Sequence, residues 1–391
     1  MNIALVIERF NIALGGAERS VSEIAEQLRK TGLDITILAS VASAGVTGVV
    51  PLCGDDPDKR VSFEVYRRAL ERHLQTTPYD IVHSTLPFTA ADVYQPMGGS
   101  YIETYIRNAA SYPNRLTAAF KRATFFTNAK RMQYLRAERT LCDHSTVTIA
   151  ALSRYVKEQY QRHFHLPDDR IAMTPNGVET HLGIDAEQSR RFERQIVSTL
   201  GLDRANTTLL LFGANNFRLK GLHDLLAAMA AFTRKNPSRR LALIVAGSGK
   251  QGAYRKQAAG LGIEHDVYFT GYTNVIQDYL AICDVAVLPS YYDPCSRFIL
   301  EGLAIAKPVI TTRYNGASEF YRHGRHGIIL DSPNQLDPFV SGLEAVAQPE
   351  TRRQMAAAIV QDNLKQAVSI ETHCQSLLNL YRSLYERKQN P

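Results

Sequence analysis

The chain has 391 residues, 45% of them hydrophobic and 21% charged, a composition typical of a globular protein with two or three domains. Its first seven residues are apolar, but Glu8 and Arg9 follow at once. This leaves too short an apolar run for a signal peptide or a membrane span and predicts a cytoplasmic protein. The formal net charge is +7, and the five cysteines, which are widely spaced and lack a Cys-x-x-Cys pair, indicate neither a disulfide framework nor a zinc site.

Short apolar runs alternate with helical patterns through the first half of the chain. Residues 2–7 are rich in β-forming side chains, the pair Gly15 and Gly16 interrupts them, and residues 21–28 repeat apolar side chains at helical spacing. Strand character returns over residues 33–39. Further strands are expected at 81–82, 147–150 and 171–174, and a helix at 155–163. Such alternation predicts βαβ units around a parallel sheet.

A second series of the same kind begins at residue 208. Residues 208–212 are predicted to form a strand, a polar loop spans 213–221, and a helix begins at about Leu222. Four more strands are expected at 241–246, 267–269, 285–288 and 308–311. We therefore expect an α/β protein of two doubly wound, Rossmann-like domains.

The domain limits follow from the polar stretch 179–206, where we place the crossing between the domains. We expect an N-terminal domain over residues 1–185 and a second domain over residues 186–370. Apolar residues at amphipathic spacing predict a helix over 370–387. Residues 371–391 should therefore form a C-terminal helix that packs on one of the domains.

A basic segment covers residues 101–140, which hold eight Lys and Arg residues against only Glu103 and Glu138. Aromatic and aliphatic side chains are mixed among these cations, as in segments that lie at a membrane surface. The basic segment therefore fits an anionic membrane or a phosphorylated acceptor, and a solvated helix face is the simpler alternative. No DNA- or RNA-binding motif is recognisable, so no nucleic-acid partner is expected.

Ligands of open parallel sheets bind beyond the carboxyl ends of the strands, so the loops after the strands are the candidate sites. In the first loop, Gly15 and Gly16 let a phosphate or a sugar approach backbone N–H groups, although a glycine pair also suits a simple turn. In a later loop, Arg218 and Lys220 precede a helix and offer the charge that neutralises a diphosphate without a metal. Asn176 lies in a Pro-Asn-Gly turn at the end of the first domain.

The most informative loop follows the strand expected at 285–288. Asp293 lies just before a helix and Glu301 lies about two turns into it, so the two carboxylates are too far apart for an acid/base pair. We interpret them as separate hydroxyl acceptors along an extended polar ligand. In the alternative interpretation, Asp293 caps the helix and Glu301 is a surface residue.

A metal-dependent enzyme of this fold class would need an Asp-x-Asp type of site at a strand end. The closest sequence is residues 56–58, Asp-Pro-Asp, in a polar stretch that contains proline and reads as a loop. We therefore expect no metal.

Together, these motifs resemble those of the family 4 retaining glycosyltransferases of the GT-B fold, in particular the lipopolysaccharide-core glucosyltransferases. The shared features, in chain order, are the loop with Gly15 and Gly16, the turn at 175–178, Arg218-x-Lys220-Gly221, the Asp293 and Glu301 pair, and residues 307–310. Their order and spacing match over nearly the whole chain. The resemblance implies two Rossmann-like domains that face each other across a cleft.

By this resemblance, Arg218 and Lys220 would bind the donor diphosphate, Asp293 a hydroxyl of the transferred sugar, and Glu301 the ribose hydroxyls. The resemblance makes Asp293, Arg218 and Lys220 the catalytic residues. Further donor contacts would come from the backbone of residues around the site, namely Gly15, Gly16, Asn176, Cys295, Ser296, Arg297 and Phe298.

Three positions depart from the family pattern. Asp293 stands where the family usually has Glu, and Ser296 with Arg297 stands where a Gly is usual. Met97 occupies the place of a His that many relatives use near the transferred sugar. Either that His is dispensable here or His83, at a neighbouring strand end, takes part; we favour the first, because a lone His is more often structural.

The resemblance implies transfer of a hexose from a UDP-sugar, with retention and without a metal or other cofactor. The acceptor would be a glycan or a lipid-linked glycan in the synthesis of lipopolysaccharide or another cell-envelope polysaccharide, and the basic segment would hold the protein on the inner face of the membrane. Two alternatives remain. A nucleotide-sugar epimerase of the same fold would need further acids and bases, and a non-catalytic nucleotide-sugar-binding protein would not need both carboxylates and both cations.

Overall fold

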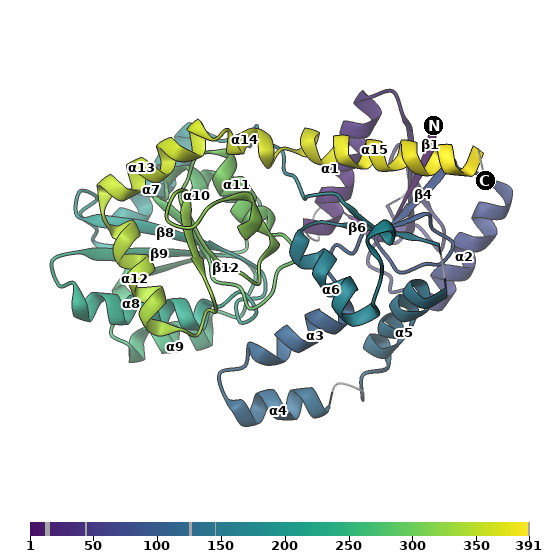
Figure 1. The fold of residues 1–391 in the computed structure, drawn as a ribbon. Coiled ribbons are helices and arrows are strands. Elements are labelled where there is room, and N and C mark those ends of the chain that lie inside the picture. The colour runs from purple at the N-terminus through teal and green to yellow at the C-terminus, as the bar shows by residue number, and fades with distance from the viewer. Residues whose placement is uncertain (12–15, 44, 125–126, 145, 390–391) are drawn as a thin grey trace. The chain divides into compact units, whose positions relative to one another are not determined.

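The computed structural model describes residues 1–11, 16–43, 45–124, 127–144 and 146–389 (Figure 1). The chain folds into two compact units, and the division passes through helices α3 (Tyr101–Ala110) and α4 (Arg115–Ala123). Unit 1 consists of Met1–Ile106, Ala119–Gly177 and Ile370–Pro391, and unit 2 consists of Arg107–Ala118 and Val178–Ser369. The domain limits drawn from the sequence remain a prediction.

Unit 1 is built on a 7-stranded parallel sheet in the order β3-β2-β1-β4-β5-β6-β7. Its strands are β1 (Asn2–Phe10), β2 (Asp34–Ala42), β3 (Val49–Pro51), β4 (Ile81–Ser84), β5 (Val93–Tyr94), β6 (Thr148–Ala151) and β7 (Ile171–Met173). Besides parts of α3 and α4, its helices are α1 (Gly16–Lys30), α2 (Phe63–Thr76), α5 (Ala129–His144), α6 (Arg154–Phe164) and α15 (Ile370–Gln389).

Unit 2 is built on a 6-stranded parallel sheet in the order β10-β9-β8-β11-β12-β13. Its strands are β8 (Thr207–Gly213), β9 (Arg240–Ala246), β10 (Val267–Gly271), β11 (Val285–Leu288), β12 (Val309–Thr312) and β13 (Gly327–Leu330). Its own helices are α7 (Ala186–Leu200), α8 (Leu222–Lys235), α9 (Gly252–Gly260), α10 (Ile276–Ile282), α11 (Arg297–Ala304), α12 (Leu336–Ala347), α13 (Pro349–Gln361) and α14 (Leu364–Ala367).

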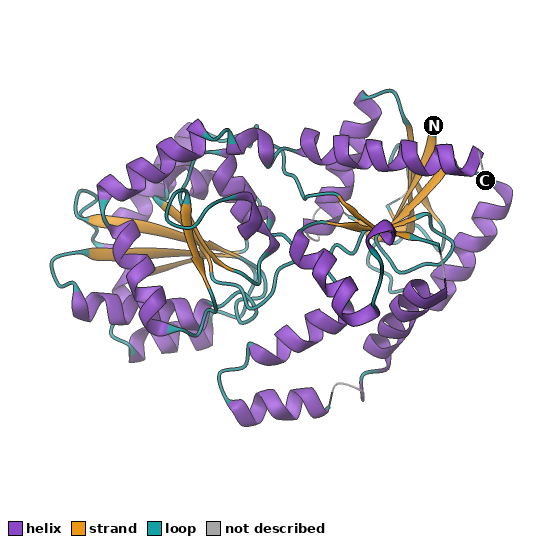
Figure 2. Cartoon of the chain, viewed as in Figure 1, coloured by secondary structure: helices purple, strands orange, loops and turns teal. Residues whose placement is uncertain are grey.

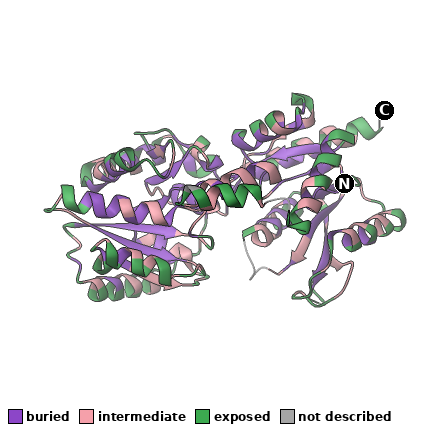
Figure 3. Cartoon of the chain, turned by 90° about the horizontal axis from the view of Figure 1, so that it is seen from below, coloured by how far each residue is buried: buried purple, intermediate pink, exposed green. Residues whose placement is uncertain are grey.

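Two parallel sheets with helices between their strands confirm the α/β class that the alternating pattern predicts (Figure 2). The strands are buried and the helices expose their outer faces, as parallel sheets require (Figure 3). Three strands were not expected from the sequence, β3, β5 and β13. Among the described residues, no helix has the length and apolar character needed to cross a membrane.

The last helix, α15, packs within unit 1 and confirms the amphipathic pattern read near the end of the chain. Its residues Leu377 and Tyr381 are fully buried and share one core cluster with residues of β1 and α1. The Tyr381 hydroxyl is also hydrogen-bonded to Nδ1 of His83. Burial lowers the pKa of His83 to about 3, so the imidazole is neutral at physiological pH. In this structure His83 is therefore a core residue of unit 1.

In unit 2, the loops that follow β8 and β11 touch at a glycine. Gly221 has a φ of +79°, and a Cβ atom at this position would overlap the carbonyl oxygen of Pro289. The backbone N–H of Tyr291 donates to the carbonyl of Leu219 at 2.9 Å, which joins the two loops a second time. Only glycine tolerates both the left-handed backbone and the close approach.

A buried carboxyl group lies in the core of unit 1. Glu138 of α5 is 0% exposed, and it accepts hydrogen bonds from the Tyr160 hydroxyl at 2.6 Å and from the backbone N–H of Tyr101 at 2.9 Å. Burial raises the pKa of Glu138 to about 7, against the hydrogen bonds, which lower it. The group therefore titrates in the physiological range.

We expect Gly221→Ala to destabilise unit 2 far more than Gly262→Ala does. Gly262 has a similar φ of +71°, but a Cβ there would meet no atom within 4 Å. The free energy of unfolding should therefore fall by only about 1–2 kcal/mol in Gly262→Ala, which is the cost of a left-handed backbone at a residue other than glycine. In Gly221→Ala the overlap with Pro289 adds to this loss. Urea unfolding of both variants measures the difference. Equal losses would show that the two loops do not depend on this contact.

The stability of unit 1 should fall between pH 5 and pH 8 because of Glu138. In the unfolded chain Glu138 releases its proton at its ordinary pKa of 4.5, whereas in the folded protein it keeps the proton up to about pH 7. The contribution of Glu138 to the free energy of unfolding is therefore fully present below the unfolded pKa and is lost as the pH rises through about 7. A shift from 4.5 to about 7 corresponds to a loss on the order of 3 kcal/mol.

Glu138→Gln keeps the side chain neutral and should remove this loss, while Glu26→Gln, at a side chain that is 71% exposed, should leave it unchanged. Urea unfolding at pH 5 and pH 8 makes the comparison. A Glu138→Gln variant with the pH dependence of the wild type would contradict the assignment.

Candidate functional site

The strand order of unit 2 reverses between β8 and β11, which lie side by side at the centre of the sheet. In open parallel sheets the crevice at such a reversal, beyond the carboxyl ends of the strands, is the usual ligand site. The loops at this point span residues 214–221 after β8 and 289–296 after β11. They contain five of the residues that the sequence singles out, Arg218, Lys220, Asp293, Cys295 and Ser296.

Lys220 and Asp293 are brought together by these two loops. The Lys220 Nζ atom lies 2.7 Å from Asp293 Oδ2 and also donates to the carbonyl of Tyr292 at 2.9 Å. The two side chains are 19% and 13% exposed, so the ion pair is largely sheltered from water without being sealed. Solvent screening of the pair is weaker than at a free surface.

Asp293 does not cap the following helix. Its Oδ1 atom accepts from the backbone N–H of Cys295 at 3.2 Å, while Ser296 occupies the N-cap position of α11 without a side-chain capping bond. The carboxylate therefore organises the loop and holds Lys220 at the same time.

Glu301 lies in the second turn of α11 and is buried, with 5% of its surface exposed. The alternative interpretation as a surface residue is therefore wrong. Its Oε1 atom lies 3.7 Å from a guanidinium nitrogen of Arg297, one turn earlier. Burying a carboxylate is costly unless it is paired, and Arg297 supplies the positive charge.

The amino-terminal turn of α11 also faces this site. Phe298 packs against Gly213 at the end of β8 so closely that a Cβ on Gly213 would lie 2.7 Å from its ring. The backbone N–H of Ser296 donates to Asn315 Oδ1 at 3.1 Å. The backbone N–H groups of a first helical turn have no intrahelical acceptor and favour negative charge, which suits a polar ligand.

Asn315 is a residue that the sequence reasoning missed. It is fully buried, its backbone forms a bridge with Asp293, and its side chain receives hydrogen bonds from Ser296 and Ala317, both at 3.1 Å. It thereby fixes the loop that carries Asp293 against the loop after β12. The signal was present, because an Asn-Gly pair a few residues after a predicted strand marks a structured turn.

Arg218 makes its contacts with the short segment 107–118 of unit 2. It donates to the carbonyl of Asn108 at 3.0 Å and to the hydroxyl of Ser111, and its guanidinium lies 3.8 Å from the ring centre of Tyr112. Burial lowers the pKa of Arg218. The structure therefore joins Lys220 to Asp293 but gives Arg218 a separate set of partners.

Three candidates belong to unit 1. Gly15 lies outside the described residues, and Gly16 is the first residue of α1. Asn176 is buried, and its side-chain oxygen accepts from the backbone N–H of Gly177 at 3.0 Å. Met97, in the place of the family's His, is partly buried.

No group of three or more His, Cys, Asp or Glu side chains with the geometry of a metal site occurs in the described parts of the chain. Asp56, in the Asp-Pro-Asp stretch, accepts from the backbone N–H of Asp58 at 3.0 Å, as in an ordinary turn.

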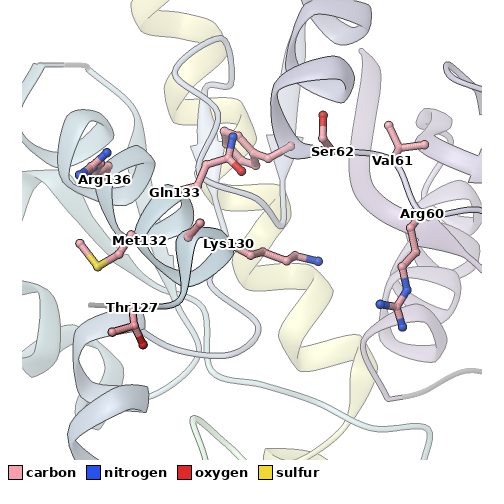
Figure 4. A pocket seen from close by; sticks show the side chains of 10 residues that line it. Arg60, Val61, Ser62, Thr127, Lys130, Met132, Gln133 and Arg136 are labelled. Atoms are coloured by element: carbon pink, nitrogen blue, oxygen red, sulfur yellow. The ribbon is translucent and has the colours of Figure 1, made fainter. Parts of the chain in front are cut away.

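A basic pocket of about 860 Å³ lies in unit 1 (Figure 4). It is formed by the starts of α2 and α5, two helices that begin beyond the carboxyl edge of the sheet. Lys130 reaches from α5 toward the segment with Arg60 and Ser62. The lining residues include three cations and no carboxylate: Arg60, Val61, Ser62, Phe63, Thr127, Ala129, Lys130, Met132, Gln133 and Arg136. Only Lys130 has an acidic partner in the described residues, Glu8 at 3.5 Å.

Two relatives share part of the sequence. The chain is 24% identical over 258 residues to an uncharacterized glycosyltransferase of Methanocaldococcus jannaschii, MJ1607, and the match covers 64% of each chain, less than two thirds of that relative. It is 22% identical over 280 residues to the lipopolysaccharide glucosyltransferase WaaG of Escherichia coli, and the match covers 68% of each chain.

Solved structures of the same fold cover nearly the whole chain. The crystal structure of WaaG, a glycosyltransferase involved in lipopolysaccharide biosynthesis, superposes with a TM-score of 0.75 at 18% identity and covers 97% of this chain and 99% of its own. Anabaena HepE in complex with UDP and glucose superposes with a TM-score of 0.69 at 18% identity, over 98% of this chain and 100% of its own. At this identity the likeness establishes the fold.

Two family models match the chain in the order of its two sheets. The model of Glycosyltransferase Family 4 matches residues 14–182, and the model of Glycosyl transferases group 1 matches residues 206–348. These domains and the shared fold confirm the family that the motifs indicate: the chain belongs to the two-domain glycosyltransferases of the GT-B fold.

Proposed function

We propose that the protein is a metal-independent, retaining glycosyltransferase that moves a hexose from a UDP-sugar to an anionic glycan or glycolipid acceptor in lipopolysaccharide or other cell-envelope polysaccharide synthesis. The observation that carries this proposal is the sheltered ion pair of Lys220 and Asp293 at the strand-order reversal of unit 2. It places one fixed cation and one fixed hydroxyl acceptor where a sugar diphosphate binds in such sheets.

The donor fits the chemistry of this site. Lys220 supplies a point charge for the diphosphate, and Asp293 accepts a hydroxyl of the sugar. The buried Glu301 accepts the ribose hydroxyls, and the backbone N–H groups of the first turn of α11 hold other hydroxyls. Arg218 would have to leave Asn108 and Ser111 to add a second charge. UDP as the nucleotide is supported by the HepE complex.

We propose a front-face reaction without a covalent glycosyl-enzyme. The bond between the sugar's anomeric carbon and the phosphate oxygen breaks, the acceptor oxygen bonds to the same face of that carbon, and the acceptor proton passes to the leaving phosphate. Lys220 stabilises the charge that develops on the phosphate. Asp293 is held by Lys220 and by the loop, which leaves it unsuited to act as a nucleophile.

The basic pocket of unit 1 supports an acceptor with phosphate or carboxylate groups. Arg60 and Arg136 have no acidic partner among the described residues, so an anion would supply the missing charge. The volume of about 860 Å³ is at the upper end for small-ligand sites and fits several sugar residues. WaaG is a lipopolysaccharide glucosyltransferase, which supports glucose as the transferred hexose.

Helix α4 supports peripheral attachment to a membrane. Leu116 and Phe120 are four residues apart on this helix and are 80% and 63% exposed. Side chains at this spacing share one helix face. The exposed Lys121 and Arg122 follow directly. An exposed apolar pair beside cations suits the surface of an anionic bilayer and favours this interpretation over a solvated helix face.

Two rivals remain distinguishable by one experiment. An epimerase would release the nucleoside diphosphate without an acceptor, and a binding protein would release nothing.

The experiment incubates labelled UDP-hexose with an envelope extract, with and without the protein. We expect labelled hexose to be transferred to the extract only when the protein is present, and the product to be retained by an anion-exchange resin. NMR of the product should show the anomeric configuration of the donor, and mass spectrometry should find no sugar bound to the protein. Acceptor-independent UDP release, or no turnover with any UDP- or GDP-sugar, would refute transfer.

Lys220→Met should lower the rate of hexose transfer by about 10²–10³, because removing one donor of transition-state stabilisation costs about 3–4 kcal/mol. The matched control is Lys235→Met at the opposite end of the adjacent helix α8, which should transfer at the wild-type rate. Initial rates of UDP release with acceptor present give the comparison. Equal rates for wild type and Lys220→Met would contradict the role of Lys220.

The double variant Leu116→Ser and Phe120→Ser should bind vesicles at least about tenfold more weakly, since each buried apolar side chain contributes about 1.5–3 kcal/mol. Flotation with vesicles containing phosphatidylglycerol, at low salt, measures this binding. Val360→Ser, at another exposed apolar residue (68% exposed), is the control and should float like the wild type. No flotation of the wild type, or equal flotation of all three proteins, would remove the membrane proposal.

A further inference from the structure

A second basic pocket lies in unit 2, at the edge of the sheet opposite to the donor loops. It has a volume of about 290 Å³ and is lined by the first residues of β8 and β9, Thr207 and Arg240, which are paired in the sheet. Arg239, from the preceding turn, and Arg352, from α13, complete its cationic lining. Because strands of a parallel sheet begin at this edge, the pocket is distinct from the site at their carboxyl ends.

The positive charge of this pocket is only partly neutralised. Arg240 is paired with Asp266 at 2.7 Å. Arg239 donates to the carbonyl of Ala347 at 3.0 Å, and Arg352 donates to the carbonyl of Val346 at 2.7 Å and to the Thr208 hydroxyl at 3.0 Å. These acceptors carry no net charge, and neither arginine has a carboxylate partner among the described residues. The pocket lining itself contains no acidic residue.

The start of α13 adds two further donors. Pro349 is the first residue of this 13-residue helix, and no side chain caps it. The backbone N–H groups of Glu350 and Thr351 in the first turn have no intrahelical acceptor. The Glu350 carboxylate is turned to Arg353, with which it forms an ion pair at 2.7 Å.

We propose that this pocket binds a phosphate group, held by Arg239 and Arg352 and by the start of α13. Guanidinium groups and helix N–H groups are donors, and a phosphate at neutral pH offers mainly acceptors. The volume of about 290 Å³ accommodates orthophosphate or a small phosphate monoester, and it is too small for a nucleotide sugar. The site is independent of the proposed sugar transfer.

Calorimetric titration of the full chain with orthophosphate and with glycerol 3-phosphate, at constant ionic strength, tests this site. Arg239→Gln should weaken the binding of the preferred compound at least about tenfold, because a charge-assisted hydrogen bond contributes about 1.5–3 kcal/mol. Arg352→Gln should weaken it by a similar factor, because Arg352 is the second cation of the lining that forms no ion pair among the described residues. The ratio of the two affinities identifies free phosphate or a monoester as the ligand.

Lys220→Met is the control for binding at the donor site and should leave the titration unchanged. A crystal soaked in tungstate should show an anomalous peak between Arg239 and Arg352. Wild-type protein that binds neither compound, binding that survives Arg239→Gln and Arg352→Gln, or binding that is lost in Lys220→Met would each overturn the proposal. The Gln side chain in Arg239→Gln retains an N–H donor for the Ala347 carbonyl, so the variant should remain folded. Urea unfolding of the variant and the wild type checks this.

Discussion

The proposed donor site of unit 2 depends on one close approach of two backbone segments, at Gly221 and Pro289. Because no side chain intervenes there, the loop after β8 lies directly on the loop after β11, and a backbone hydrogen bond joins Leu219 to Tyr291. This contact brings Lys220 within 2.7 Å of Asp293. The charge at the site is therefore fixed by the fold before any ligand binds, which reduces the reorganisation that binding and catalysis require.

The ion pair has a consequence for the donor. On the proposed function, a donor diphosphate would share or replace the partner of Lys220, so part of the binding energy would be spent on separating Lys220 from Asp293. The separation would free the Asp293 carboxylate to accept a sugar hydroxyl. A ligand with both a phosphate and a sugar satisfies both groups, whereas a nucleoside diphosphate alone leaves Asp293 with one partner fewer. The arrangement thus favours a complete donor over the product that leaves.

Sequence reasoning predicted much of this architecture, because its signals are local. The strands from β8 to β12 are apolar runs bounded by turn residues, and Arg218, Lys220 and Asp293 follow such runs directly. What the sequence did not show depends on distant pairings. The contact of Arg218 with Asn108 links positions 110 residues apart. The buried Glu138 and the bridge from Asn315 to Asp293 likewise follow only from the packed structure.

The most direct test of the account is a crystal structure with UDP-glucose bound to the protein. We expect a phosphate oxygen of the donor within hydrogen-bonding distance of Lys220 Nζ, at about 2.7–3.2 Å, and the Asp293 carboxylate bonded to a sugar hydroxyl. Phosphates bound elsewhere in unit 2, with the ion pair of Lys220 and Asp293 intact and remote from the nucleotide, would contradict it.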